Sequence, residues 1–225
     1  NPILVPGDFN ADGRTDLAAL RRSNQTGVLI LLGKSDGTFE VSGPIGPAMA
    51  PSLAAVGDVD ADGMQDLVVA YPVAYPGHES ITVLLGNGDG TFDMGATFPT
   101  PRQHVSLALG DLNGDGKLDL AAGNPAPIAV VGYIGGSISV LLGQSDGFFG
   151  EEKLYYAGVG SPDHLRVGIA DFDLDGHADL LADSAGILFG AGDGTFGSPQ
   201  VFARFGAGII EDFNRDGWPV IALAS

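Results

Sequence analysis

The chain alternates short apolar runs with polar, glycine-rich turns along its whole length. One kind of apolar run follows an aspartate-rich turn, as in Leu67-Val68-Val69-Ala70. Another ends in Leu-Gly, as in Leu84-Leu85-Gly86. Short apolar runs bounded by turn residues are typical of buried strands. In the second repeat this pattern predicts strands at residues 52–57, 66–70, 80–85 and 91–98.

Two motifs mark the turns. The first, D-x-[DN]-x-D-G-x-x-D, begins at residues 8, 58, 111 and 171, and an altered copy begins at residue 212. The second joins Leu-Gly to Asp-Gly and Phe at residues 31–39, 84–92, 141–149 and 188–196, and Asp-Gly between apolar runs is a strong hairpin signal. Four strands per unit at a period of roughly 40 to 60 residues predict propeller blades. The repeats span approximately 1–48, 49–101, 102–161, 162–203 and a partial 204–225.

The first motif has the composition of a chelating loop for a hard cation. Ca²⁺ takes about 6–8 oxygen ligands, and alternate side chains of a tight loop supply them while glycine permits the bend. An EF-hand would need Glu at position 12, where this chain has alanine or valine, and flanking helices. We therefore predict calcium loops that join the first and second strands of each repeat, about four ions in all.

The predicted side-chain ligands occupy positions 1, 3, 5 and 9 of each loop, and the backbone carbonyl of position 7 completes the shell. In order these residues are Asp8, Asn10, Asp12, Arg14 and Asp16; Asp58, Asp60, Asp62, Met64 and Asp66; Asp111, Asn113, Asp115, Lys117 and Asp119; Asp171, Asp173, Asp175, His177 and Asp179. The fifth loop has Val220 at position 9. We expect a weak or empty site there, formed by Asp212, Asn214 and Asp216.

Charge narrows the range of partners. The formal net charge is -18 with a pI near 4.1, which argues against binding nucleic acid or anionic membrane surfaces. Half of the 28 acidic residues lie in the four intact loops, so their mutual repulsion should destabilise the metal-free protein. No apolar run approaches the roughly 20 residues that cross a bilayer. Loops of this kind fill where Ca²⁺ is millimolar, which favours an extracellular or cell-surface location.

The two alternating motifs resemble the FG-GAP/VCBS-type repeats of integrin α-subunit propellers and of many secreted proteins. The resemblance covers essentially the whole chain. It implies an all-β propeller, or a propeller segment, of four-stranded antiparallel blades with calcium loops on the lower face. It also implies that ligands meet the upper face or the clefts between blades, as in the lectins and adhesion modules built on this scaffold.

About four and a half repeats leave three arrangements open: a fragment of a longer propeller, a closed ring of five with one thin blade, or an open arc. An open arc has unpaired strand edges, which favour self-association with other copies. We expect the chain to be a fragment or an open arc.

Several residues outside the loops are candidates for ligand binding. His104 and His164 each lie seven residues before a loop aspartate, among polar neighbours, where a sugar-binding role competes with simple hydrogen bonding. Tyr71 and Tyr75, and Tyr133 in a predicted loop at residues 124–136, would suit sugar stacking or protein contact if exposed.

Catalysis has little support in the sequence. The chain has no cysteine and no G-x-S-x-G motif, and its carboxylate pairs are assigned to metal. The preferred interpretation is a calcium-stabilised, non-catalytic binding or adhesion module for a glycan or a protein. The alternatives are a self-assembling or propeller-completing repeat scaffold and an accessory domain of a secreted carbohydrate-active enzyme.

Overall fold

The computed structural model describes residues 2–21, 27–72, 79–130, 133–158, 165–182, 186–201, 208–211 and 220–223. Strands make up nearly all of the regular structure in these ranges, and one short 3-10 turn occurs at Ser145–Gly147. The chain divides into two compact units, residues 1–103 with 144–148 and residues 104–143 with 149–225. In the ranges above, no helix is long and apolar enough to cross a membrane.

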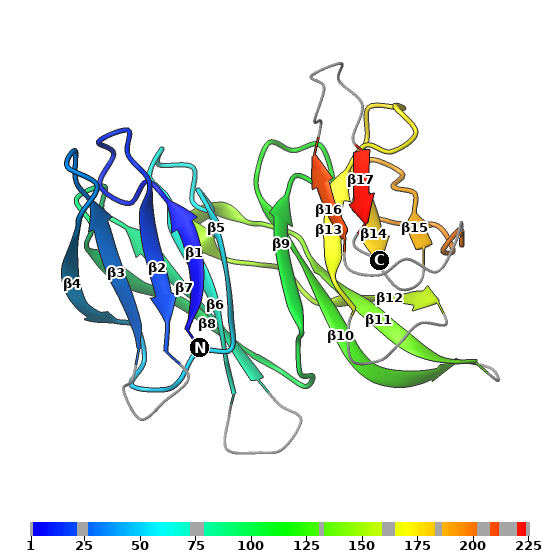
Figure 1. Cartoon of the computed structure of the whole chain (residues 1–225). Helices are drawn as coiled ribbons and strands as arrows, with labels where there is room; N and C mark the ends of the chain where they lie inside the picture. The colour runs from blue at the N-terminus through cyan, green and yellow to red at the C-terminus, as the bar shows by residue number, and fades with distance from the viewer. Residues whose placement is uncertain are drawn as a thin grey trace. The chain divides into compact units, whose positions relative to one another are not determined.

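The first unit contains two four-stranded antiparallel sheets, each with its strands in sequence order (Figure 1). The first sheet consists of β1 (Ile3–Gly7), β2 (Asp16–Leu20), β3 (Val28–Gly33) and β4 (Phe39–Ile45). The second consists of β5 (Leu53–Gly57), β6 (Asp66–Pro72), β7 (Glu79–Gly86) and β8 (Phe92–Thr100). The four strands predicted for the second repeat are confirmed, and each observed boundary lies within two residues of the predicted one.

The second unit contains a third four-stranded sheet and two smaller sheets. Its strands are β9 (Ser106–Gly110), β10 (Asp119–Val130), β11 (Tyr133–Leu141) and β12 (Lys153–Gly158); β13 (Val167–Ala170), β14 (Asp179–Ala182) and β15 (Gly186–Leu188); β16 (Gly208–Glu211) and β17 (Val220–Leu223). Beside β15, isolated bridges join Ile187 to Gln200 and Gly190 to Phe196 in place of a fourth strand. Antiparallel sheets of three or four strands, one per repeat, match the blades that the sequence predicts.

One expectation about this unit is wrong. Residues 124–136 were expected to form a loop, but β10 and β11 continue pairing as far as Val130 and Tyr133. The register shifts between Asn124 and Ile128, a segment that contains two prolines. Proline lacks the N–H that a regular ladder requires, and a bulge accommodates it without ending the hairpin.

Apolar side chains fill the space between successive sheets within each unit. In the first unit, Leu20 and Ile30 from the first sheet are buried in one cluster with Leu67 and Leu84 from the second. In the second unit, Ile138 and Val140 pack in the same way with Leu180 and Leu188. Within each unit, two successive sheets thus bury facing sides against one another, as expected for repeats that cannot bury their apolar faces alone.

A hydrogen bond between repeats recurs in both units. The backbone N–H of Gly90, in the Asp-Gly turn of the second repeat, donates to the carbonyl oxygen of Phe9 in the first loop, 2.9 Å away. Gly194 donates to the carbonyl oxygen of Leu112 in the same way, at 3.1 Å. The aromatic ring of Phe92 also packs edge-on against Phe9, with ring centroids 5.6 Å apart. The Asp-Gly turns of the second and fourth repeats therefore contact the aspartate-rich loops of the first and third repeats.

Candidate metal loops

The four intact aspartate-rich loops connect the first and second strands of their sheets, as predicted. In each loop the first aspartate accepts a hydrogen bond from the backbone N–H of the glycine at position 6. The Oδ2 to nitrogen distances are 2.9 Å for Asp8 and Gly13, 2.9 Å for Asp58 and Gly63, 2.8 Å for Asp111 and Gly116, and 2.9 Å for Asp171 and Gly176. In all four intact loops, the first carboxylate is therefore hydrogen-bonded to the backbone five residues later.

The side chains at positions 3 and 5 form a second repeated feature. Oδ1 of position 3 accepts from the backbone N–H of position 5 at 3.2 Å in Asn10, 3.2 Å in Asp60, 3.0 Å in Asn113 and 3.2 Å in Asp173. Oδ1 of position 5 accepts from the N–H of position 7 at 2.7 to 3.0 Å. These side chains mimic backbone turns, which keeps alternate oxygens on the inside of the loop.

The backbone of the loop alternates between ordinary and left-handed conformations. The glycines at position 6 have φ between 78° and 90°. Position 4 is also left-handed, with φ of 54° at Ala11, 62° at Ala61 and 60° at Leu174. Only Gly114 meets this requirement without steric strain, because it has no Cβ. Sequence reasoning identified the need for glycine at position 6 but missed the same requirement at position 4.

The aspartate at position 9 does more than the sequence predicts. Asp16, Asp66, Asp119 and Asp179 are fully buried. One oxygen of each accepts the backbone N–H of loop position 2 at 2.8 Å. The other accepts the N–H of a glycine at or just after the end of the third strand. The distances are 2.6 Å from Gly33, 2.8 Å from Gly86, 2.5 Å from Gly143 and 2.8 Å from Gly190. This residue ties the loop to the third strand of its own sheet.

The glycine of the Leu-Gly pair is sterically necessary for this tie. A Cβ at Gly33, Gly86, Gly143 or Gly190 would lie 2.2 to 2.4 Å from the carbonyl oxygen of loop position 8. Real Cβ atoms do not come so close to backbone. The repeated Leu-Gly in the sequence is the signal that could have revealed this contact.

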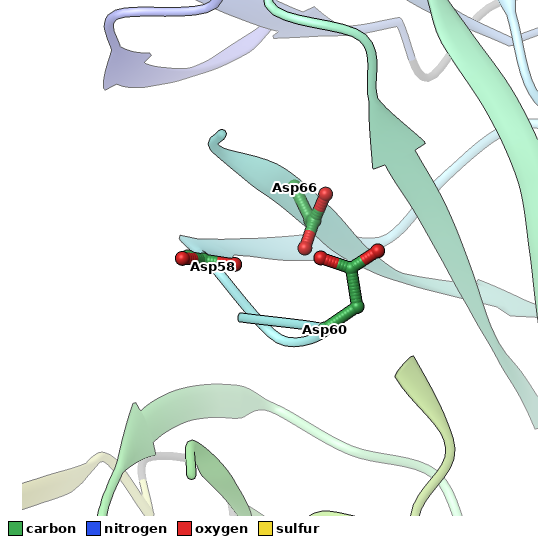
Figure 2. A group of neighbouring side chains, drawn as sticks. All are labelled: Asp58, Asp60 and Asp66. Atoms are coloured by element: carbon green, nitrogen blue, oxygen red, sulfur yellow. The ribbon is translucent and has the colours of Figure 1, made fainter. Parts of the chain in front are cut away.

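Loops 2 and 4 bring three carboxylates together. The first group consists of Asp58, Asp60 and Asp66, and the second of Asp171, Asp173 and Asp179. Within each group, every residue has a carboxylate oxygen within 4.8 Å of an oxygen of the other two. Figure 2 shows the carboxylates of Asp60 and Asp66 turned toward each other beside Asp58. Oδ1 of Asp171 is buried and has no hydrogen-bond partner. An uncompensated buried carboxylate oxygen is costly, and a hard cation is the partner that this set of oxygens fits.

Burial raises the pKa of several of these carboxyl groups. Burial raises the pKa of Asp66 to about 6, against the opposing effect of N–H groups from Gly86 and Val59. Burial also raises the pKa of Asp119 and of Asp179, and neighbouring loop carboxylates add to the effect. The pKa of Asp60 is raised by burial and by the charges of Asp62 and Asp58. A divalent cation would offset these costs directly.

Loops 1 and 3 contain a partial substitute for that cation. The guanidinium of Arg14 forms an ion pair with Asp12, and Nζ of Lys117 lies 3.9 Å from Oδ2 of Asp115. Hydrogen bonds from Asn10 and Arg14 and the charge of Arg14 outweigh desolvation and lower the pKa of Asp12. Both pairs are exposed, so each contributes little to stability, and neither prevents position 5 from turning to an ion.

Comparison with known families agrees with this geometry. A model described as an FG-GAP-like repeat matches residues 8–69 and 58–122, and an FG-GAP repeat model matches residues 105–141. The first two matches begin at the first aspartates of loops 1 and 2. The chain belongs to the FG-GAP-like repeat family. Repeats of this family are common in extracellular and adhesion proteins, are generally non-catalytic and often bind calcium. No curated protein matches the chain.

In this FG-GAP-like protein, two of the proposed ligand-binding residues are buried. Tyr71 is fully buried on β6, and its hydroxyl is a buried group without a hydrogen-bond partner. The expectation of an exposed tyrosine at this position is therefore wrong. Tyr71 follows Ala70 on a strand that continues to Pro72, so it enters the core between the first two sheets instead of a loop.

His104 is also buried, with 3% of its surface exposed, and an accessible sugar-binding role does not agree with this position. Its Nδ1 lies 2.6 Å from Oδ1 of Asn124. Nδ2 of Asn124 donates to Ser137 and Ser139, so its Oδ1 is an acceptor and His104 Nδ1 carries the hydrogen. Ser139 in turn donates to the carboxylate of Glu152. The histidine belongs to a hydrogen-bonded network within the third sheet.

For the remaining predicted residues, the structure describes only part of the chain or only the backbone. His164, Tyr75 and the fifth-loop residues Asp212, Asn214 and Asp216 lie outside the described residues. Tyr133 is the first residue of β11, so its backbone belongs to a strand. The backbone carbonyls predicted as ligands belong to Arg14, Met64, Lys117 and His177, at loop position 7. In all four loops, the backbone N–H of this residue donates to Oδ1 of the aspartate at position 5.

Proposed function

We propose that this chain is a calcium-stabilised, non-catalytic binding or adhesion module that works outside the cell and recognises a glycan or another protein. The observation that carries the calcium part is the buried, unpartnered Oδ1 of Asp171 within the group formed with Asp173 and Asp179. The same hydrogen-bonded turn occurs in all four loops. Membership of a family common in extracellular and adhesion proteins supports the location and the type of role.

Each ion would be held by the side chains at positions 1, 3, 5 and 9 and by the carbonyl of position 7. A bound Ca²⁺ supplies positive charge where carboxylates of raised pKa gather. The chain's own part is to present the oxygens. Oδ1 and Oδ2 of Asp66 each accept one N–H, and each oxygen retains a further lone pair. The fold thus fixes the direction of the ninth-position carboxylate before any ion arrives.

The calcium proposal is tested by thermal unfolding and calorimetric titration of metal-free protein. We expect calcium to stabilise the protein by about 4 kcal/mol for each occupied site when its concentration is about 1,000 times the dissociation constant of that site. Asp173→Asn should weaken binding at loop 4. Asp193→Asn is the matched control, because Asp193 lies in an Asp-Gly-Thr turn and accepts only from Thr195 among the hydrogen bonds described. Equal unfolding with calcium and with chelator would contradict the proposal.

The binding role needs a separate test, because calcium would stabilise an inert scaffold equally well. Calcium-loaded protein should bind a subset of glycans on an array, or an extracellular protein in a surface screen. Binding that disappears with chelator and returns with calcium would support a calcium-stabilised module. Failure across both screens would favour the scaffold alternative.

One observation favours that second candidate, a scaffold that joins further blades. In the second repeat, Leu67 and Leu84 lie opposite each other on neighbouring strands and are buried against the preceding repeat. Leu180 and Leu188 do the same in the fourth repeat. The equivalent pair in the first repeat, Leu17 and Leu31, is only half-buried. Leu4 and Val41 extend this first-sheet face and are 51% and 61% exposed.

This face of the first sheet therefore has the apolar composition of a surface that packs between blades, and no described residues cover it. Another blade of the same type would fit it. Light scattering of the purified chain tests the idea. Association between copies that Leu17→Lys abolishes would support a scaffold role. The control is Val201→Lys, because Val201 is 64% exposed and lies in the other unit. A monomer at all concentrations would contradict self-assembly.

A further inference from the structure

Loop 3 contains a dipeptide that the other loops lack. Asn-Gly occurs twice in the chain, at Asn87-Gly88 and at Asn113-Gly114, and the second pair occupies positions 3 and 4 of the loop. Asn-Gly is the dipeptide most prone to cyclise, because glycine has no Cβ to hinder attack by its backbone nitrogen on the asparagine side chain. The equivalent residue in loops 1, 2 and 4 is Ala11, Ala61 or Leu174.

The loop orients both reacting groups. Oδ1 of Asn113 accepts the N–H of Asp115 at 3.0 Å, so the side chain folds back over the Gly114 peptide. That N–H would stabilise negative charge on the oxygen as the amide carbon becomes tetrahedral. The N–H of Gly114, which must lose its proton, points to Oδ1 of Asp111 at 2.7 Å. Gly114 is exposed, so water reaches the site.

We propose that Asn113 is a self-modification site, which deamidates when loop 3 is metal-free and is protected when a cation occupies the loop. The protection rests on the proposed calcium binding. The nitrogen of Gly114 bonds to Cγ of Asn113, the bond from Cγ to Nδ2 breaks, and ammonia leaves with the proton from Gly114. Water then opens the cyclic imide at either carbonyl and gives aspartate or isoaspartate.

A cation opposes the first step for a structural reason. It would hold Oδ1 of Asn113 and the carboxylate of Asp111, whereas cyclisation moves the Gly114 nitrogen away from Asp111 and rotates the Asn113 side chain. The loop must rearrange for the ring to close, and an ion bound at several of its residues resists that rearrangement.

The two products have opposite consequences. Aspartate at position 113 gives loop 3 the residue that loops 2 and 4 have in Asp60 and Asp173, and so an additional carboxylate for a divalent ion. Isoaspartate inserts a methylene into the main chain and disrupts the repeated turn. Loss of calcium would thus leave a permanent chemical record in one loop of the four.

The chain provides its own controls. Asn10 occupies the same position in loop 1 and makes the same hydrogen bond, from Asp12 N–H to Oδ1 at 3.2 Å, but Ala11 follows it. Asn87 is followed by glycine outside the aspartate-rich loops, with its Nδ2 donating to Thr91 Oγ1 at 3.0 Å. Asn10 therefore controls for the loop, and Asn87 controls for the dipeptide.

The experiment incubates folded protein in mildly alkaline buffer with calcium or with chelator and follows each asparagine by peptide mass mapping. We expect Asn113 to convert several-fold faster with chelator than with calcium, and faster than Asn10 in chelator. Asn87 should convert at a rate that calcium does not change. Circular dichroism of both samples shows whether the fold persists.

Two exchanges sharpen the test. Gly114→Ala should protect Asn113 from deamidation. The added Cβ would meet no close atom, since the nearest one is the carbonyl oxygen of Gly192 at 3.8 Å. Ala11→Gly should make metal-free Asn10 convert. Titration calorimetry of the same samples separates the two proposals, because absence of calcium binding refutes the proposed function by itself. An unmodified Asn113 in chelator, or acceleration of Asn113 and Asn87 alike, would overturn the inference.

Discussion

The backbone N–H of Gly86 donates to Oδ1 of Asp66 across 2.8 Å, although twenty residues separate the two in sequence. Oδ2 of the same carboxylate accepts the N–H of Val59 at 2.8 Å. One buried side chain thus joins the candidate cation loop to the end of the third strand of its sheet. The same pair of bonds occurs in every intact repeat. The residue that we propose as a cation ligand therefore also joins the strands of its own sheet.

Asp66→Asn should destabilise the metal-free protein at about pH 4, where the wild-type carboxyl is largely uncharged and its charge adds no cost. The amide presents one NH₂ group to a buried N–H donor, and a buried donor left without a partner costs about 1–3 kcal/mol. Urea unfolding in chelator measures the change. If Asp66 served only as a cation ligand, the substitution would leave the stability of the metal-free protein unchanged at this pH.

The stability of the metal-free protein should depend on pH through Asp66. Its folded pKa of about 6 lies above the ordinary aspartate pKa of 3.8, so the folded state binds this proton more tightly than the unfolded state. This group therefore costs stability above pH 6, by up to about 3 kcal/mol, and the cost disappears as the pH falls toward 4. The difference in unfolding free energy between wild type and Asp66→Asn, measured in chelator from pH 4 to about 7, isolates the effect.

Calcium should reverse the sign of that dependence, because a bound ion requires the ionised carboxylate. Calcium affinity should fall as the pH drops through about 6, where Asp66 takes up its proton. An affinity that is constant between neutral pH and pH 5 would show that Asp66 does not contribute to binding.

Gly90→Ala should loosen the contact between the first two repeats. Gly90 has a φ of 83°, and a Cβ there would lie 2.9 Å from the side chain of Leu32. We expect a loss of about 1–2 kcal/mol from backbone strain and a further, smaller loss because the end of the Leu32 side chain must shift.

Gly37→Ala is the matched control, because Gly37 has a φ of 81° in the equivalent turn and a Cβ there would meet nothing within 4 Å. It should cost only the backbone term. Equal losses in the two variants, measured by urea unfolding, would show that the contact with Leu32 contributes nothing.

Leu174→Gly should stabilise the fourth loop. Leu174 has a φ of 60° and is 41% exposed, so its side chain offers little packing to compensate for the left-handed conformation. Removing the strain should gain about 1–2 kcal/mol, and the extra freedom of glycine in the unfolded chain should cost about 0.5–1 kcal/mol. The net gain is therefore up to about 1.5 kcal/mol. Thermal unfolding in chelator would detect it, and a lower melting temperature would contradict the explanation.

The sequence by itself determined the repeating unit and the positions of the candidate cation loops. In the second repeat, the alternation of apolar runs with Asp-Gly turns fixed the strands to within two residues, because strand burial and turn conformation are local requirements. The spacing of Asp58, Asp60 and Asp66 indicated a hard-cation loop, because alternate side chains of one tight turn need no distant partner.

Only the tertiary structure decided what depends on contacts between distant segments. It showed that Asp66 binds the third strand through Gly86, that Tyr71 and His104 are buried, and that β10 continues past two prolines. Burial and pairing of these residues are set by which sheet packs against which, and by a bulge that adjusts register. Those are properties of the assembled sheets, which no local pattern of residues encodes.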